Sequence, residues 1–597
     1  GYKDYSKTLM LAQVELKQDL GFILKGLSAR GLYNTTRYSY FDVSRDYAPF
    51  YYSLGNYDRQ TGEYMLQALN PLTGSEYINH FGTSEDVTTT VYYEAALQYA
   101  NTFAEDHSVG GLLVLTGRNE LRGNIKNDLQ LSFPYRNVGL SGRLTYGYKN
   151  KYFIEGNFGY NGSERFAQSE TFGFFPSAGL GYLISNEDFW QPFEKTVNKL
   201  KLKATYGLVG NDAIGDSDDR FFYLSKVNMS DAGKGMAFGT ERAYSRNGIS
   251  ISRYADPDIT WETAYKQNYG IELGLFNKFE AQVDYFREHR TNILQTRADI
   301  STTMGLQATP KANIGEALGS GIDLSVDYSQ SFRPDFWLTV HGNFTYAHSE
   351  YKVFEEPVYA GQPWRLHVGQ PLQQSFGLIA ERLFIDDEDV RNSPTQLCGE
   401  YGKGDIKYKD INMDGKIDMQ DVLAIGYPTT PEIIYGGGFS MGYKNFDLSA
   451  FFQGSAYSSL FINVKNVSPF LDTDENNSIN SQNQLLQMIA DNHWSDENRN
   501  PHAFWPRLTD RYLENNGQRS TWFMRDGAFV RLKTLEFGYT VPQNLANKMH
   551  LGMLRFYLSG TNLLTWSKFK LWDPEQGGNG LNYPVQRVFN VGINISL

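Results

Sequence analysis

The stretch VGLSGRLTYGYKNKYFIEGNFGY at 138–160 decides the fold, because apolar and polar residues alternate along it on both sides of a Lys-Asn-Lys turn. Leu140 and Leu144 share one face of the first half, and Ile154 and Phe158 share one face of the second half. A repeat of two residues is the repeat of a β-strand. The stretch therefore predicts a β-hairpin with one apolar face and one polar face.

Aromatic residues flank the turn of this hairpin. Tyr148 stands directly before the turn, and Tyr152 stands directly after its three residues. In membrane β-barrels, aromatic residues form girdles at the membrane–water interfaces, and the apolar face of each strand meets lipid. The hairpin is therefore typical of a strand pair in a membrane barrel.

The same alternation recurs along the whole chain and predicts about 17 antiparallel strands. We expect them near 7–18, 22–40, 88–103, 108–120, 135–148, 151–161, 170–185, 198–211, 262–276, 279–294, 316–328, 336–350, 433–443, 446–457, 526–541, 551–564 and 586–597.

The predicted connections fall into two classes that alternate along the chain with few exceptions, such as the short connection 162–169. One class consists of short turns, and the other includes the long segments 41–87, 212–261, 351–432 and 458–525. Short turns on one rim and long loops on the other are typical of outer-membrane barrels. A soluble β-sandwich or propeller also alternates, but it does not predict this one-sided distribution of loops.

The composition excludes several classes of protein. The 597 residues carry a net charge of −12, which argues against a nucleic-acid-binding protein. A single cysteine, Cys398, excludes a disulfide framework and a cysteine-ligated metal centre. No run of apolar residues is long enough for a transmembrane helix. Aromatic residues make up 15% of the chain and charged residues only 20%, which fits strands with one lipid-facing side.

Several longer motifs resemble the SusC/RagA family of TonB-dependent transporters. They are VGLSGRLTYGYKNKYFIEGNFGYNGSERF from 138, KLKLKATYGLVGND at 199–212, GDIKYKDINMDGKID at 404–418, RDGAFVRLKTLEFGYTVP at 525–542 and NLLTWSKFKLWDPE at 562–575. The resemblance implies a barrel of about 22 strands around an N-terminal plug. We therefore expect 1–597 to be the C-terminal portion of such a barrel, with the plug and an odd number of strands preceding it. On this expectation 351–432 and 458–525 are long extracellular loops.

The resemblance also implies a function. Such proteins sit in outer-membrane lipid and import large nutrients, either oligosaccharides or oligopeptides. They pair with a SusD-like surface lipoprotein that acts as a lid, they contact TonB through their N-terminal region, and two such pairs can form a dimer. We expect no enzymatic activity. A passive porin is one alternative; a secreted β-rich carbohydrate-binding protein or glycoside hydrolase is the other.

One local motif predicts a structural calcium site. The stretch DINMDGKIDMQD at 410–421 places oxygen ligands at the spacing of a calcium-binding loop, with a glycine at the sharp turn. The predicted ligands are Asp410, Asn412, Asp414, Lys416 through its backbone carbonyl, Asp418 and Asp421. The alternative is an Asp- and Gly-rich turn without metal.

Two further groups of residues are candidates for contact with a substrate. The first consists of aromatic residues in or beside the long loops, which we expect to be exposed and to meet a sugar, meet the lid or hold the loops together: Trp261, Tyr359, Trp364, Trp494, Trp505 and Trp522. The second consists of carboxylates on the polar face of the strands: Glu155, Glu272, Glu280 and Asp284. Paired carboxylates can hydrolyse glycosidic bonds, but on this face they are expected to line a polar interior.

Overall fold

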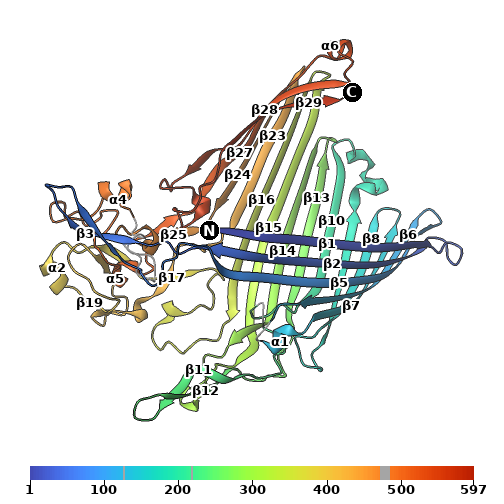
Figure 1. Cartoon of the computed structure of the whole chain (residues 1–597). Coiled ribbons are helices and arrows are strands. Elements are labelled where there is room, and N and C mark those ends of the chain that lie inside the picture. Colours follow the sequence, from blue (N-terminus) through green and yellow to red (C-terminus); the bar gives the residue numbers. More distant parts are fainter. Residues whose placement is uncertain (126–127, 217–218, 471–483, 597) are drawn as a thin grey trace.

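The computed structural model describes residues 1–125, 128–216, 219–470 and 484–596, and its main feature is one antiparallel sheet of 17 strands (Figure 1). Each strand pairs with the next one along the chain, so the predicted number and order of strands are confirmed. The strands are β1 (Tyr2–Asp19), β2 (Leu27–Asp46), β5 (Asn79–Phe103), β6 (His107–Arg122), β7 (Tyr135–Tyr148), β8 (Tyr152–Ser163), β9 (Phe172–Leu183), β10 (Val197–Asn211), β13 (Glu262–Leu275), β14 (Phe279–Thr296), β15 (Lys311–Arg333), β16 (Phe336–Val353), β23 (Ile433–Tyr443), β24 (Phe446–Ala456), β27 (Phe529–Thr540), β28 (Met553–Ser567) and β29 (Val588–Ser596).

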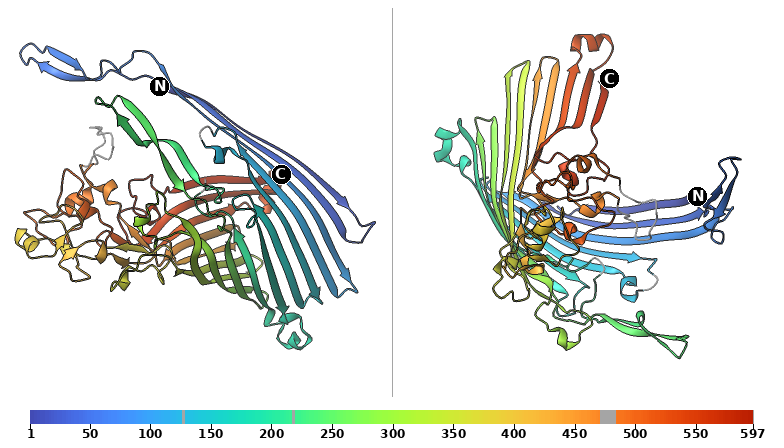
Figure 2. Two further views of the ribbon diagram at one scale, coloured as in Figure 1. Left: turned by 90° about the horizontal axis from the view of Figure 1, so that it is seen from below. Right: turned by 90° about the vertical axis from the view of Figure 1, so that its left-hand side faces the viewer.

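The sheet is strongly curved but open. Strands β1 and β29 form its two edges, and within the described residues each pairs with a neighbour on one side only. Figure 2 shows the sheet as a trough, with β1, β2 and β5 running at a large angle to the last strands of the chain. This curvature is the one expected of a barrel wall, because twisted strands coil as they are added side by side.

The tight turns have the backbone geometry that antiparallel hairpins require. Lys149 and Asn150 have φ angles of 53° and 52°, and Phe276 and Asn277 both have 55°. These angles lie in the left-handed region, where the twist of the turn matches the twist of the flanking strands. Tyr148 consequently lies opposite Tyr152 in the register, as the alternation predicted.

The connections alternate between two rims of the sheet. The short-turn rim carries 20–26, 104–106, 149–151, 184–196, 276–278, 334–335, 444–445 and 541–552. The long-loop rim carries 47–78, 123–134, 164–171, 212–261, 297–310, 354–432, 457–528 and 568–587. The predicted asymmetry of the loops is confirmed.

Several predicted strand boundaries are wrong: the strand expected at 88–103 begins at Asn79, and the one expected at 316–328 spans Lys311–Arg333. The start expected at 22 shows one physical reason. The strand expected at 22–40 begins only at Leu27, because Phe22, Ile23 and Leu24 lie in the preceding turn. That turn is closed by a hydrogen bond from the backbone N–H of Leu20 to the carbonyl of Leu27. The three apolar side chains are exposed at the short-turn rim, so their apolar character did not mark a strand.

The long connections contain small elements that the sequence pattern did not predict. Two hairpins project from the long-loop rim, β3–β4 and β11–β12. The short strands are β3 (Tyr52–Tyr57), β4 (Tyr64–Ala68), β11 (Lys226–Phe238), β12 (Tyr244–Arg253), β17 (Ser375–Gly377), β18 (Ala380–Leu383), β19 (Thr395–Gln396), β20 (Ile406–Tyr408), β21 (Lys416–Ile417), β22 (Leu423–Ile425), β25 (Ser459–Phe461) and β26 (Met524–Asp526).

The helices of the described residues are all short. The α-helices are α1 (Leu129–Ser132), α2 (Asp387–Arg391), α3 (Val464–Val467), α4 (Gln487–Asp491), α5 (Glu514–Gly517) and α6 (Gln543–Lys548). The 3₁₀ helices are η1 (Ile184–Asn186), η2 (Asp188–Phe193), η3 (Thr302–Met304), η4 (Pro363–Arg365), η5 (Met419–Asp421) and η6 (Pro574–Gln576). Within the described ranges, none is long and apolar enough to span a membrane.

The hydrophobic cores lie in the loops and not in the sheet. The larger core joins the two longest connections and includes Leu383, Ile406 and Ile489, which are fully buried. A smaller core packs Phe166 and Phe222 together from two connections of the long-loop rim. A single curved sheet has no second layer to pack against, so its apolar face must be covered by something outside the described chain.

Candidate functional site

The convex, apolar face of the sheet is uncovered. Leu144, Ile154 and Leu180, from three neighbouring strands, are 71%, 54% and 61% exposed. Soluble monomeric proteins rarely expose a continuous apolar surface of this size. Lipid chains are the environment in which such a face is stable.

Aromatic residues line this face at the short-turn rim. Tyr148, Tyr152 and Tyr182 lie side by side on three strands, with neighbouring ring centroids 6.5 and 5.0 Å apart. Farther along the same rim, the ring of Phe446 packs 4.9 Å from that of Tyr539. The row has the position of the aromatic girdle that the sequence predicted.

The concave, polar face of the sheet is held by ion pairs. Three of the four predicted carboxylates pair with cations on nearby strands: Glu155 with Arg143 (2.6 Å), Glu272 with Lys199 (2.9 Å) and Asp284 with Lys203 (3.1 Å). The fourth, Glu280, is exposed on the same face. Sequence reasoning missed the cationic partners, because the pairing depends on the register between strands.

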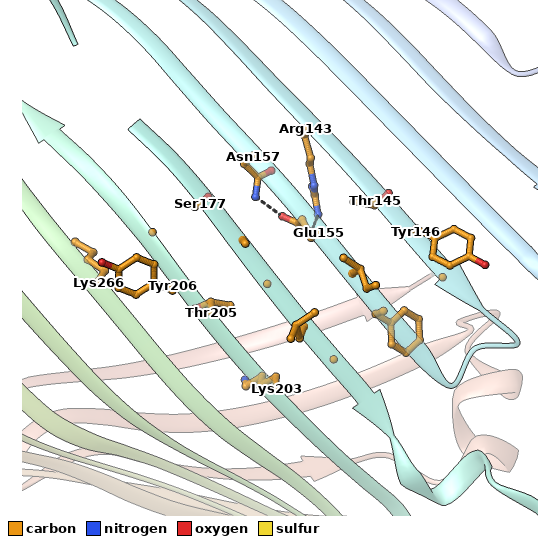
Figure 3. Close-up of a pocket in the computed structure, with 18 of the residues that line it drawn as sticks. Arg143, Thr145, Tyr146, Glu155, Asn157, Ser177, Lys203, Thr205, Tyr206 and Lys266 are labelled. Atoms are coloured by element: carbon orange, nitrogen blue, oxygen red, sulfur yellow. Dashed lines mark hydrogen bonds and ion pairs between the residues drawn. The ribbon is translucent and has the colours of Figure 1, made fainter. Parts of the chain in front are cut away.

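A pocket of about 610 Å³ lies on this inner face between β7 and β13 (Figure 3). Asn157 and Arg143 point at Glu155, whose carboxylate accepts hydrogen bonds of 2.9 Å from the Asn157 Nδ2 and 2.6 Å from the Arg143 Nη2. Ser177 and Lys203 line the pocket from β9 and β10. The wall presents donors and acceptors together, which suits contact with a polar, hydrated molecule.

The connections 354–432 and 457–528 form one body at the long-loop rim, which we call the loop unit. The backbone N–H of Leu378 donates to the carbonyl of Arg519 (2.9 Å), and that of Leu383 donates to the carbonyl of Pro501 (2.8 Å). These bonds join the two connections across more than a hundred residues of sequence. Together with their shared core, they make the loop unit a folded part and not a pair of independent loops.

A buried carboxylate connects the two halves of the loop unit. Asp405 is fully buried and accepts two hydrogen bonds of 3.0 Å from the guanidinium of Arg507. It also accepts bonds from the Asn516 side chain and the Gly402 backbone, both 2.8 Å long. Burial raises the pKa of Asp405, and the positive charge of Arg507 opposes that rise. The full set of partners offsets the cost of burying the charge.

The fold and both faces of the sheet agree with a known family. A family model described as "TonB dependent receptor-like, beta-barrel" matches residues 2–563. The chain belongs to this family. Its members are outer-membrane β-barrel transporters and not enzymes. The alternative of a secreted carbohydrate-binding protein or glycoside hydrolase is therefore wrong.

Relatives and solved structures extend this result. The chain is 27% identical over 507 residues to TonB-dependent receptor P26 of Formosa agariphila, covering 79% of this chain and 48% of the relative. It is 25% identical over 552 residues to TonB-dependent receptor SusC of Bacteroides thetaiotaomicron, covering 87% and 51%. The chain thus spans about half the length of these curated relatives.

A structure of the RagAB peptide transporter has the same fold. It superposes with a TM-score of 0.69 at 20% identity, covering 99% of this chain and 62% of that chain. The predicted resemblance to the SusC/RagA group is therefore confirmed, together with the barrel fold.

The aromatic candidates of this barrel protein have different environments. Trp261, Trp494 and Trp505 are buried in the two loop cores, so the prediction that they are exposed is wrong. They pack the loops together, which was one of their three predicted roles. The environment of Trp261 illustrates this, because its ring lies 5.3 Å from that of Phe166 and its Nε1 donates to the carbonyl of Glu170.

The other three candidates are half-buried. The Tyr359 ring stacks under the guanidinium of Arg365 at 4.1 Å, and the Trp364 Nε1 donates to the carbonyl of Gln420 (2.9 Å). Trp522 packs against the core of the loop unit. Contact of Tyr359, Trp364 and Trp522 with a substrate or lid stays a prediction.

The predicted calcium loop folds as a turn braced by its own carboxylates. Asp410 accepts a hydrogen bond of 2.8 Å from the backbone N–H of Gly415, and the buried Asp421 accepts from those of Ile411 (2.8 Å) and Asp418 (2.9 Å). Across the described residues, no group of three or more His, Cys, Asp or Glu side chains is placed to hold a metal ion. The calcium site stays a prediction.

Proposed function

We propose that this chain forms most of the barrel wall of a TonB-dependent importer of large nutrients, either oligosaccharides or oligopeptides, in the bacterial outer membrane. The observation that carries the proposal is the two-faced curved sheet of a TonB-dependent receptor barrel. Its uncovered apolar face suits lipid, and its ion-paired concave face suits a hydrated passage.

The same proposal assigns a partner to the loop unit. A SusD-like surface lipoprotein covers the long-loop rim, which then faces the outside of the cell, and two such complexes can associate as a dimer. The support is the likeness to SusC and to RagAB, together with the folded loop unit, which offers a firm platform at that rim. TonB acts on a region outside this chain.

The test uses the full-length protein that contains this chain, which we call the parent protein, in the bacterium that produces it. Deleting its gene is expected to abolish uptake of one class of fluorescently labelled oligosaccharide or peptide, and deleting TonB is expected to do the same. Uptake that continues without TonB would favour a passive porin. The parent protein must also be recovered from the outer-membrane fraction only with detergent, and recovery in buffer alone would reject the proposal.

The lid is tested separately. An affinity tag on the parent protein is expected to retain a surface lipoprotein from detergent-solubilised outer membranes. Deleting 384–402 within the loop unit is expected to release it, because this segment carries α2 and β19 at the end of the loop unit that is farthest from the 17-stranded sheet (Figure 1). Retention of the lipoprotein by that variant would contradict docking on the loop unit.

A further inference from the structure

A second pocket, of about 370 Å³, lies on the convex, apolar face of the sheet, where β10, β13 and β14 approach the long-loop rim. We call it the outer pocket. Its lining residues are Tyr206, Tyr265, Gln267, Arg287, His289 and Thr291.

The strand register places these side chains on one face of the sheet. Tyr206 lies opposite Gln267, and Gln267 lies opposite Arg287, so the three form a row across the strands. Tyr265 lies opposite His289, one step nearer the rim. Each lining residue stands an even number of positions from the apolar residues that its own strand exposes on the convex face. The outer pocket therefore opens towards lipid and not towards the barrel interior.

The outer pocket lies at the far edge of the lipid-facing band. The residues that β14 first presents on the convex face, counted from the short turn, are Phe279, Ala281, Val283 and Tyr285. Arg287 comes next on that face and is the ninth residue of β14. A barrel strand needs about 9–11 residues to cross the hydrocarbon core of a bilayer. The side chain of Arg287 therefore lies where the lipid tails give way to headgroups.

The charge of Arg287 has no partner within the described residues. The side chain is exposed, and no described carboxylate lies within ion-pair distance of its guanidinium. Its direct neighbours on the adjoining strands, Gln267 and Ser320, are uncharged. The carboxylates farther towards the rim have partners of their own: Glu316 with His289, Glu350 with Lys352 and Glu432 with His348. Charged side chains at membrane depth are stabilised by pairing, so the position favours an anion from outside the chain.

The rest of the outer pocket suits a polar headgroup above apolar tails. Tyr206 is 48% exposed, and the ring of Tyr265 lies 6.3 Å from that of His289. Tyrosine is favoured at membrane interfaces because its ring is apolar and its hydroxyl is polar. No carboxylate lines the pocket to repel an anion. Arg287 is thus surrounded by neutral groups that can bind the same headgroup.

We propose that the outer pocket binds the phosphate group of an anionic lipid in the outer leaflet, with Arg287 holding the phosphate. This inference rests on the proposed function for the membrane and for the orientation of the long-loop rim. A guanidinium binds phosphate through two parallel hydrogen bonds. The acyl chains of the same lipid then lie along the apolar residues of β13 and β14. Lipid is the favoured occupant over a soluble protein, because the pocket continues the face that meets lipid.

The test measures lipid binding to the parent protein in a neutral detergent by native mass spectrometry. The probes are bisphosphorylated lipid A, the same lipid A after enzymatic removal of its phosphates, and inorganic phosphate. The phosphorylated lipid is expected to bind at least about tenfold more tightly than the dephosphorylated lipid, which corresponds to about 1.4 kcal/mol. Inorganic phosphate at the same concentration is expected not to displace it, because it lacks the acyl chains.

Substitutions of the arginine test its part. Arg287→Gln is expected to lose the preference for the phosphorylated lipid. Arg287→Lys is expected to retain part of it, because lysine keeps the charge but not the paired hydrogen bonds. The matched control is Arg290→Gln, which removes the same charge from the polar face of the same strand, where Arg290 pairs with Glu262 and Glu288. The control is expected to bind lipid as the unaltered protein does.

Four outcomes would overturn the assignment. They are equal binding of the two lipids, displacement of the lipid by inorganic phosphate, equal loss in the Arg290→Gln control, and a smaller dimer fraction of Arg287→Gln with unchanged lipid preference. The last outcome would mean that Arg287 contacts a second copy of the protein.

Uptake by cells separates this inference from the proposed function. A parent protein that imports a nutrient but does not prefer the phosphorylated lipid refutes only the lipid site. A parent protein that has this preference through Arg287, yet is dispensable for all uptake, refutes only the importer.

Discussion

A single carboxylate, Asp389, organises the outer end of the loop unit. It accepts hydrogen bonds from the Arg382 guanidinium (2.9 Å to Nη2) and the Ile385 backbone (3.1 Å), and it lies 3.3 Å from the Lys407 ammonium. Although burial by itself raises the pKa, these partners hold the pKa of Asp389 well below its usual range. A lowered pKa contributes stability that is present above the usual value of about 4 and is lost as the pH falls below it.

The substitution Asp389→Asn tests this contribution. It is expected to lower the free energy of unfolding of the segment around α2 by about 1.5–3 kcal/mol at neutral pH, because it removes hydrogen bonds to a charged acceptor. Hydrogen–deuterium exchange of peptides from 380–395, corrected for intrinsic rates, is expected to accelerate. In the unaltered protein this protection declines as the pH falls below about 4, and in the variant it does not. The same decline in both proteins would contradict the assignment.

The strands make the clearest prediction at the scale of single elements, because neighbouring positions of β7 face different environments. Leu144→Arg puts a charge on the apolar face and is expected to destabilise the inserted barrel by about 2–4 kcal/mol if it lies near the bilayer midplane. Ser141→Arg puts the same charge on the polar face and is expected to be tolerated. Both effects are measured after reconstitution in vesicles, as the fraction of parent protein that resists unfolding in urea. Equal destabilisation by the two substitutions would mean that the apolar face does not meet lipid and the polar face does not meet water.

The loop 410–421 carries a prediction about metal. If it binds a structural calcium ion, the parent protein purified with calcium retains one more ion than the variant D410A/D414A, as measured by elemental analysis after dialysis. The hydrogen bonds within the loop do not require an ion. Equal metal content in the two proteins would therefore favour the metal-free turn.

At the scale of the whole molecule, the two rims are expected to face opposite sides of a membrane. An epitope inserted after Gly239, in the turn of the projecting hairpin β11–β12, is expected to bind antibody on intact cells. An epitope inserted at 444–445, on the short-turn rim, is expected to bind only after the outer membrane is permeabilised. The opposite pattern would reverse the proposed orientation.

The alternation of side chains is enough to determine the sheet. A strand places successive residues on opposite faces, so local sequence alone indicates a lipid face, a polar face and the turns between them. This is why the number of strands, their order and the hairpin register at Tyr148 and Tyr152 agree with the prediction. The strand expected from residue 22 begins late because apolar residues also occur in the exposed turn that precedes it.

Only the tertiary structure decided what the long loops do. Trp494 and Trp505 lie in a long connection outside the alternating strands, so nothing local indicated that they are buried in a core shared by two distant connections. The guanidinium of Arg220 likewise donates to the backbone carbonyls of Gln130, Phe133 and Pro134, which belong to another connection nearly ninety residues away. Strand pairing is local along this chain and follows from its repeat, whereas these loop contacts join residues far apart in sequence and depend on how the whole sheet curves.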